Sequence, residues 1–268
     1  MVLVEHLKTF VKERPRLYDL ALRGLRMTGR KTSTYDLLRE FARRTGGVVN
    51  FVQIGANDGL RSDPIREFVV RYGWRGVMVE PMPFAFDALR RNYAGYPRLD
   101  LVFLNAAVSE VREEKVFWTI DVAQLGHLSE EDRLSLSRKS SFDRELLESF
   151  LPPDLDVDLA LAPLKLDCLT FEDVVAAMPG SARPELLVVD AEGYDGVIIR
   201  SNDFSRFRPQ VVIFEHGHLG DTYAAVHQHL LDAGYRMYRV RGNTIAAVEE
   251  LSLDWLDSRV PYGDTPAT

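Results

Sequence analysis

The chain has 268 residues, of which 46% are hydrophobic and 27% are charged, with a formal net charge of −7. Such values are ordinary for a soluble globular protein with ample material for a core. The single cysteine, Cys168, excludes an internal disulfide, and no apolar run approaches the length of a membrane span. Because the N-terminus also lacks the basic-then-apolar layout of a signal peptide, we expect a cytoplasmic protein.

The charge is unevenly placed along the chain. Residues 1–45 carry +6 and the remainder carries −13. A basic segment on an acidic body is compatible with a nucleic-acid or membrane-surface contact, or with packing on its own domain or on a second subunit. The basic residues are scattered rather than run together, which favours packing and leaves a homo-oligomer through the N-terminal helices open. The acidic body, with a pI near 5.5, disfavours nucleic-acid binding.

The first part of the chain has a helical pattern. Apolar residues over 2–44 recur at three- and four-residue steps, as Leu37, Leu38 and Phe41 do, and Gly46 with Gly47 would end the last helix. This pattern predicts a helical extension over residues 1–46.

Strands and helices alternate after residue 47. We predict strands at 48–54, 76–80, 101–105, 116–120, 163–168, 185–190 and 209–215, helices at 64–72, 84–93, 171–178, 193–200 and 223–233, and a closing hairpin of 235–240 with 244–248. The alternation predicts βαβ units and a mostly parallel sheet in a domain over 47–260, followed by a frayed tail at 261–268. Residues 121–162 are rich in Ser, Asp, Glu and Pro and contain one predicted helix, 142–150. We expect an acceptor-side insertion there, the alternative being a mobile polar loop.

Polar residues follow the predicted strands. In a parallel sheet, ligands bind beyond the carboxyl ends of the strands. The residues at those ends are Gln53, Asn57, Asp58, Glu80, Asn105, Asp190, Glu192, Glu215 and His216. We therefore expect them along one rim.

The first of these corners has glycines at 55 and 59, a Gly-x-x-x-Gly spacing rather than the Gly-x-Gly-x-x-Gly of dinucleotide folds. S-adenosylmethionine (SAM) has no phosphate, and a wider loop with polar side chains suits it better. Asn57, Asp58 and Ser62 are candidates to bind its amino-acid end. Glu80 lies where a carboxylate would accept both hydroxyls of a ribose.

The sequence resembles the FkbM family of SAM-dependent methyltransferases over about residues 48–216. The resemblance rests on the segments 51–59 (FVQIGANDG), 79–81 (VEP), 105–108 (NAAV) and 189–194 (VDAEGY). It implies a class I methyltransferase (Rossmann-like) fold with a mostly parallel seven-stranded sheet, helices on both faces and an antiparallel terminal hairpin. It also implies O-methylation of a hydroxyl on a small molecule, a sugar or a secondary metabolite. The SAM-binding residues are then expected to be Gln53, Gly55, Asn57, Asp58, Gly59, Ser62, Glu80, Pro81, Asn105, Ala106 and Asp190.

Three residues are candidates for catalysis. The resemblance places Asp190 at the methyl-transfer site, and a histidine is the usual base near neutral pH. His216 is the first choice for that base and His218 the second. Asp190, Glu192 and Glu215 with the histidines could instead hold a divalent ion such as Mg²⁺, although their spacing is not diagnostic.

Three function classes remain open from the sequence. The leading one is a small-molecule O-methyltransferase. A nicotinamide-dependent oxidoreductase is disfavoured because Gly-x-Gly-x-x-Gly is missing. A SAM-binding scaffold without catalysis is disfavoured by Asp190, Glu192 and His216.

Overall fold

A computed structural model describes residues 33–126, 128–137, 139–153, 155–240 and 242–251. The helical pattern predicted over 2–32, with the oligomer contact suggested for it, and the tail at 261–268 lie outside these residues. In the described part, helix α3 (Ser33–Arg44) places Leu37, Leu38 and Phe41 in the core, each at most 1% exposed. The spacing of these residues therefore predicted a buried helix face correctly.

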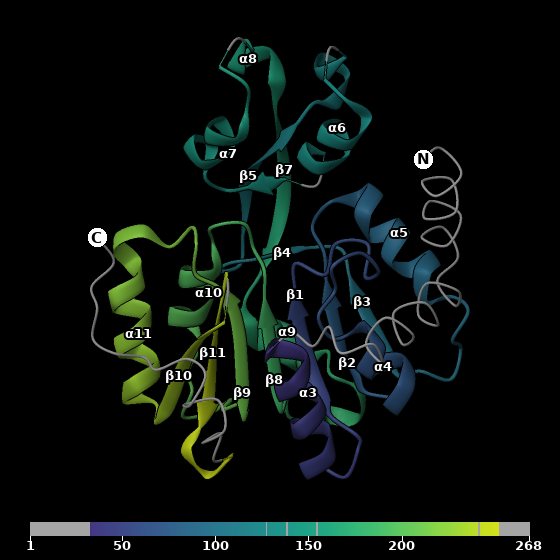
Figure 1. Cartoon of the computed structure of the whole chain (residues 1–268), viewed down its shortest axis with the longest axis vertical. Coiled ribbons are helices and arrows are strands. Elements are labelled where there is room, and N and C mark those ends of the chain that lie inside the picture. Colours follow the sequence, from purple (N-terminus) through teal and green to yellow (C-terminus); the bar gives the residue numbers. More distant parts are fainter. Residues whose placement is uncertain (1–32, 127, 138, 154, 241, 252–268) are drawn as a thin grey trace.

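The described strands of the main sheet number seven and follow the order β10–β11–β9–β8–β1–β2–β3 (Figure 1). Their bounds are β1 (Asn50–Ile54), β2 (Arg75–Val79), β3 (Leu101–Leu104), β8 (Leu186–Val189), β9 (Val211–Glu215), β10 (Tyr235–Val240) and β11 (Asn243–Val248). All neighbouring strands pair in parallel except β11, which is antiparallel to both β9 and β10. The predicted parallel sheet with a closing hairpin is confirmed.

The central strands are buried on both faces. Successive side chains of a strand point to opposite faces, yet Val52, Gln53 and Ile54 of β1 are each at most 3% exposed. The covering helices are α3, α4 (Arg66–Tyr72), α5 (Pro83–Tyr93), α9 (Phe171–Ala176), α10 (Asp195–Ser201) and α11 (Tyr223–Asp232). Single turns of 3₁₀ helix are η1 (Val122–Leu125), η2 (Pro179–Ser181), η3 (Gly220–Thr222) and η4 (Glu249–Leu251). This two-sided cover explains why these strands are continuous hydrophobic runs.

A second sheet rises from the main one. In the described residues it contains β4 (Ala107–Val108), β5 (Glu113–Ile120), β6 (Ser140–Ser141) and β7 (Leu161–Leu169), in the order β4–β7–β5–β6. The strands predicted at 116–120 and 163–168 therefore pair with each other in this sheet, with Ile120 opposite Leu161. The sequence could not show this pairing, because the partners lie about forty residues apart in the chain.

Residues 121–160 connect β5 to β7 and form what we call the cap. It carries α6 (Glu130–Leu136), α7 (Arg144–Phe150) and α8 (Val157–Ala160) and stands beyond the main sheet (Figure 1). A separate apolar cluster, which includes Leu125, Leu147 and Ala160, holds these elements together. The predicted insertion thus has a core of its own, and its predicted helix begins at Arg144, where Asp143 caps it.

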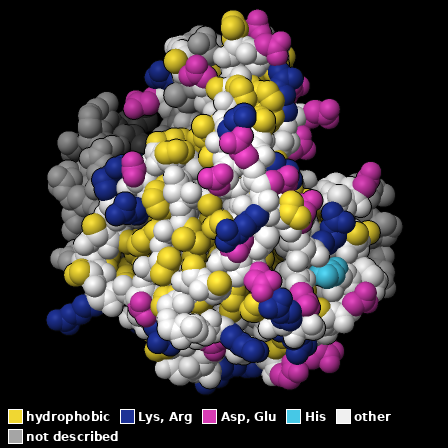
Figure 2. Space-filling view, turned by 180° about the vertical axis from the view of Figure 1, so that it is seen from behind, with side chains coloured by type: hydrophobic (Ala, Val, Ile, Leu, Met, Phe, Trp, Pro, Cys, Tyr) yellow, Lys and Arg dark blue, Asp and Glu magenta, His cyan; other side chains and the backbone are white. Residues whose placement is uncertain are grey.

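The described surface carries mixed charge. Figure 2 shows acidic and basic side chains interspersed around a hydrophobic area on the face opposite to that of Figure 1. No helix among the described residues is long and apolar enough to cross a membrane.

Candidate active site

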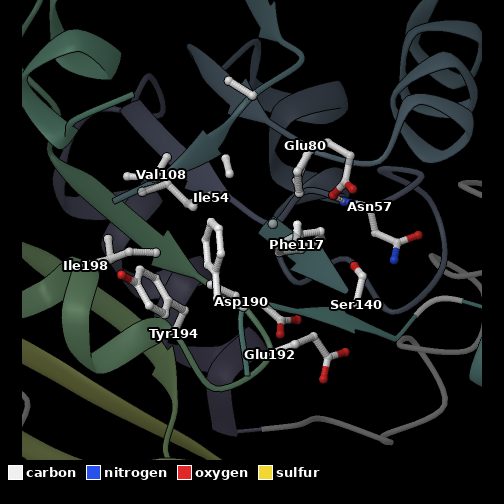
Figure 3. A pocket seen from close by; sticks show the side chains of 16 residues that line it. Ile54, Asn57, Glu80, Val108, Phe117, Ser140, Asp190, Glu192, Tyr194 and Ile198 are labelled. Carbon is white, nitrogen blue, oxygen red and sulfur yellow. Dashed lines mark hydrogen bonds between the residues drawn. The ribbon is translucent and has the colours of Figure 1, made fainter. Parts of the chain in front are cut away.

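A cavity lies between the carboxyl ends of the central strands and the cap (Figure 3). Asn57 and Glu80 lie together in one part of it, Tyr194 and Ile198 in another, and Asp190 beside Glu192. The lining residues are Ile54, Gly55, Asn57, Glu80, Pro81, Ala106, Ala107, Val108, Phe117, Ser140, Phe142, Asp190, Ala191, Glu192, Tyr194 and Ile198. Of the nine residues expected along one rim, Asn57, Glu80, Asp190 and Glu192 line this cavity, and residues of the cap line it as well.

Gly55 lets β1 and β8 approach each other at this rim. Its φ is +78°, and a Cβ there would lie 1.8 Å from the carbonyl oxygen of Asp190. The Gly55 amide donates to the carbonyl of Val79 at the end of β2. Only glycine combines a left-handed φ with so close a backbone approach, so this residue joins three strand ends.

Glu80 is a buried acid with a defined orientation. One carboxylate oxygen accepts from the Asn57 amide at 2.8 Å, and the other accepts from the Met82 amide at 2.9 Å. Burial raises the pKa of Glu80 to about 7, the two amide bonds oppose this, and the charge of Asp58 adds to it. Each carboxylate oxygen has a second lone pair, so Glu80 can still accept two hydroxyls from a ligand.

Asp190 lines the cavity where β8 ends. As a whole residue Asp190 is exposed to solvent, and it lines the cavity beside Ala191 and Glu192. Burial raises the pKa of Asp190 to about 8, helped by the negative charges of Asp195, Glu192 and Glu215 and opposed by Lys139. Asp190 is therefore held largely in its neutral form near pH 7, and a cationic ligand would favour its ionised form.

Hydrogen bonds to Asp195 fix the turn after β8. This carboxylate is 1% exposed and accepts from the amides of Ala191, at 3.1 Å, and Glu215, at 3.2 Å. Burial raises the pKa of Asp195 to about 7 despite these bonds. Asp195 therefore ties the end of β9 to the turn that carries Asp190, a role that the sequence analysis missed.

Several predicted SAM ligands do not line the cavity. Gln53 is 3% exposed and bonds to Asp63, and Asp58 accepts from the amides of Leu60 and Arg61. The missing Cβ of Gly59 makes room for Leu89 and Tyr93 of α5. Ser62 is exposed, and Asn105 donates to the carbonyls of Glu80 and Pro81, which fixes the loop after β2. Gly55, Asn57, Glu80, Pro81, Ala106 and Asp190 do line the cavity.

The two candidate histidines lie outside the lining residues. The Nδ1 of His216 is 3.2 Å from the Thr244 hydroxyl in β11, and its ring packs near Tyr223. Burial lowers the pKa of His216, and the nearby Arg239 charge adds to this. His218 lies closer to the cap, with its ring 5.5 Å from that of Phe150. Neither histidine therefore lines the cavity that contains Asp190.

Part of the metal set predicted from sequence does come together. Among the described residues, ligand atoms of Glu192, Glu215 and His218 lie within 4.8 Å of one another, whereas Asp190 does not belong to this group. Lys139 already occupies both carboxylate oxygens of Glu192, at 3.0 and 2.8 Å. The cluster thus contains a cation supplied by the cap.

The cap and its strands supply lining residues that the sequence analysis did not identify. They include Phe117, Ser140 and Phe142. The ring of Tyr194, in the turn after β8, is tilted against that of Phe142, with ring centroids 4.6 Å apart. The Lys115 ammonium donates to the Tyr194 hydroxyl at 2.7 Å, which in turn donates to Glu110 at 3.0 Å. These bonds fix the Tyr194 ring against the cavity.

The strand order with its reversed β11, the glycine corner and the acid that follows β2 define a class I methyltransferase fold. Residues 53–237 match the model of the methyltransferase FkbM domain. The chain belongs to the FkbM methyltransferase family, whose activity implies the use of SAM.

Similar solved structures include methyltransferase FkbM from Methylobacillus flagellatus KT, at 12% identity and a TM-score of 0.47. The match covers 75% of this chain and 44% of that one, so the chain spans less than half the length of this relative. Aeropyrum pernix fibrillarin in complex with natively bound SAM matches at 12% identity and a TM-score of 0.37, covering 75% of this chain and 66% of that one. Precorrin-6y C5,15-methyltransferase from Geobacter metallireducens matches at 13% identity and a TM-score of 0.37, over 74% and 77% of the two chains. No curated protein sequence matches this chain.

Proposed function

We propose that this methyltransferase transfers the methyl group of SAM to a hydroxyl oxygen of a small molecule or sugar, with Asp190 as the base. The observation that carries the proposal is the position of the Asp190 carboxyl in the cavity that Gly55 and Glu80 also line. SAM, when bound, supplies a methyl carbon activated by a positively charged sulfur. The chain has to hold the hydroxyl in line with that carbon and remove its proton.

The acidic lining supports SAM over a nicotinamide cofactor. Glu80, Asp190 and Glu192 line the cavity. The sulfonium and ammonium of SAM would favour the ionised forms of Glu80 and Asp190, whose pKa values are raised to about 7 and about 8 in the free protein. NAD(P)H carries a diphosphate, which the same carboxylates would repel. The electrostatics of the site thus argue against the oxidoreductase alternative.

In this proposal each lining group has a separate task. Glu80 accepts the ribose hydroxyls, and the residues around Gly55 and Asn57 hold the amino-acid end. Ala106 and Pro81 lie near the adenine. Asp190 accepts the proton of the acceptor hydroxyl as the methyl group moves.

The ribose assignment predicts that Glu80→Gln weakens SAM binding by roughly tenfold to 100-fold, the usual worth of hydrogen bonds to a charged group. In the wild type, SAM affinity should fall as the pH drops below about 7, because Glu80 then gains a proton. Calorimetric titration of SAM from pH 6 to pH 8 measures both effects.

Glu114→Gln, an exposed carboxylate paired with Lys165, serves as the matched control and should bind SAM as the wild type does. Circular dichroism establishes that Glu80→Gln is folded. Tight SAM binding by a folded Glu80→Gln protein would remove Glu80 from the ribose site. Binding of NADPH with no heat from SAM would overturn the proposed function.

A further inference from the structure

The Lys139 ammonium, from the cap, lies against an acidic side chain of the turn after β8. It donates to both carboxylate oxygens of Glu192 and lies 4.7 Å from the centre of the Phe150 ring. The side chains of Lys139 and Glu192 are only 27% and 20% exposed. The pair is thus shielded from water more than a surface ion pair would be, and this strengthens its electrostatic interaction.

The side chains beside this ion pair have the composition of a divalent-cation site. The ligand atoms of Glu192, Glu215 and His218 lie within 4.8 Å of one another, and they come from the turn after β8, the end of β9 and the turn after β9. Carboxylate oxygens and an imidazole nitrogen are common ligands of divalent ions. These ligands come from two segments of the chain, and they converge beside the Lys139 ammonium.

The cap contacts the segments that carry these ligands at further points. The Ser141 hydroxyl donates to the carbonyl of Glu192 at 2.7 Å, and the absent Cβ of Gly193 leaves room for Leu146 of α7. Phe150 of the same helix contacts His218 edge-on. These contacts hold the segment that carries Lys139 in place over the carboxylates.

We propose that Lys139 is the resident cation of this site and takes the role that a divalent ion would have there. This inference rests on the proposed function for its catalytic part. Lys139 does not itself line the cavity, but its partner Glu192 does. An ammonium has three donors and Glu192 accepts at two oxygens, so in this proposal a further N–H binds an acceptor oxygen held beside Glu192. Lys139 then positions that oxygen and stabilises its negative charge as the proton passes to Asp190. The oxygen–methyl bond forms as the methyl–sulfur bond breaks, and S-adenosylhomocysteine leaves.

The experiment replaces Lys139 with the uncharged, unbranched methionine and measures Mn²⁺ binding to the full chain by calorimetry. Without the ammonium, the freed carboxylates should bind Mn²⁺ with a dissociation constant of about 10 μM. The wild type should bind more weakly than about 1 mM, a difference of about 100-fold within the range that charge count sets in such sites. Lys139→Met/Glu192→Gln should lose the gained site.

Lys165→Met is the matched control, because it breaks a lysine–glutamate pair on the exposed surface of β7. It should gain no Mn²⁺ site. If Lys139→Met does not fold, Lys139→Gln takes its place.

Two results would overturn the inference. One is Mn²⁺ binding by the wild type as tight as by Lys139→Met, and the other is no gain in a folded Lys139 variant. Neither result depends on methyl transfer, so failure of this inference is distinct from failure of the proposed function. With an acceptor in hand, Mn²⁺ should restore turnover to Lys139→Met and leave the wild type unchanged, which a purely structural role of Lys139 would not produce.

Discussion

Gly55→Ala should abolish measurable SAM binding and lower the free energy of unfolding by about 3 kcal/mol or more. The new Cβ would lie 1.8 Å from the carbonyl oxygen of Asp190, so the ends of β1 and β8 would have to separate. The separation would displace Asn57 and Asp190 together, and a displacement of about 1 Å at a reactive site commonly costs about 100-fold. Thermal unfolding and calorimetry with SAM measure the two effects.

Gly73→Ala is the matched control for this variant. Gly73 also has a positive φ, +68°, but nothing lies within 4 Å of its added Cβ. This variant should lose only about 1–2 kcal/mol, the usual penalty of a left-handed residue, and should keep SAM binding. Equal effects of the two substitutions would show that the close approach at Gly55 is not what shapes the site.

Asp190→Asn should lower kcat by about 100- to 10,000-fold, the usual contribution of a general base. The variant keeps the shape of the side chain and removes its ability to take a proton. Because the pKa of Asp190 is about 8, the residue is largely neutral at pH 7 in the free protein. SAM affinity should therefore change only a few-fold, which separates a catalytic defect from a binding defect.

The rate of methyl transfer should increase with pH. The base must be ionised, so kcat/KM of the wild type should rise with pH up to about 8 and then level off. Bound SAM brings positive charge near the carboxylate, so the corresponding step in kcat should lie at lower pH. Asp100→Asn is the control, because Asp100 is exposed and precedes the amino end of β3, away from the carboxyl ends that line the cavity. This variant should change neither profile. Wild-type turnover by Asp190→Asn would exclude Asp190 as the base.

Much of the fold follows from local sequence patterns. Runs such as 186–189 are buried on both faces, and such runs separated by helical segments specify a parallel sheet. The corner at Gly55 and the acid at Glu80 were also predictable, because both lie directly at strand ends. The path of the chain then brings them into one cavity.

The roles of several polar residues could not be predicted, because local backbone bonds compete with ligand binding. Asp58 follows the glycine turn as a ligand would, but its short side chain accepts from amides two and three residues on. His216 directly follows Glu215, the last residue of β9. Its ring turns to Thr244, a residue from a distant strand that the sequence could not place beside it.

The residues that the cap contributes to the cavity could not be predicted from the sequence either. Phe142 lines the cavity and Lys139 contacts Glu192 because β5 and β7 carry the cap over the sheet. Those two strands pair with each other although about forty residues separate them in the chain. No periodic pattern identifies such residues. For this reason the sequence predicted the cavity residues of the main sheet but none of those from the cap.

The most direct test of the account is to follow a labelled methyl group from SAM onto a panel of sugars, alcohols and amines, with and without EDTA. We expect the label to appear in an ether formed at a hydroxyl oxygen. EDTA should leave the rate unchanged, and Asp190→Asn should lose the activity. Label found on nitrogen or carbon, or transfer that requires a metal restored after EDTA treatment, would contradict these expectations.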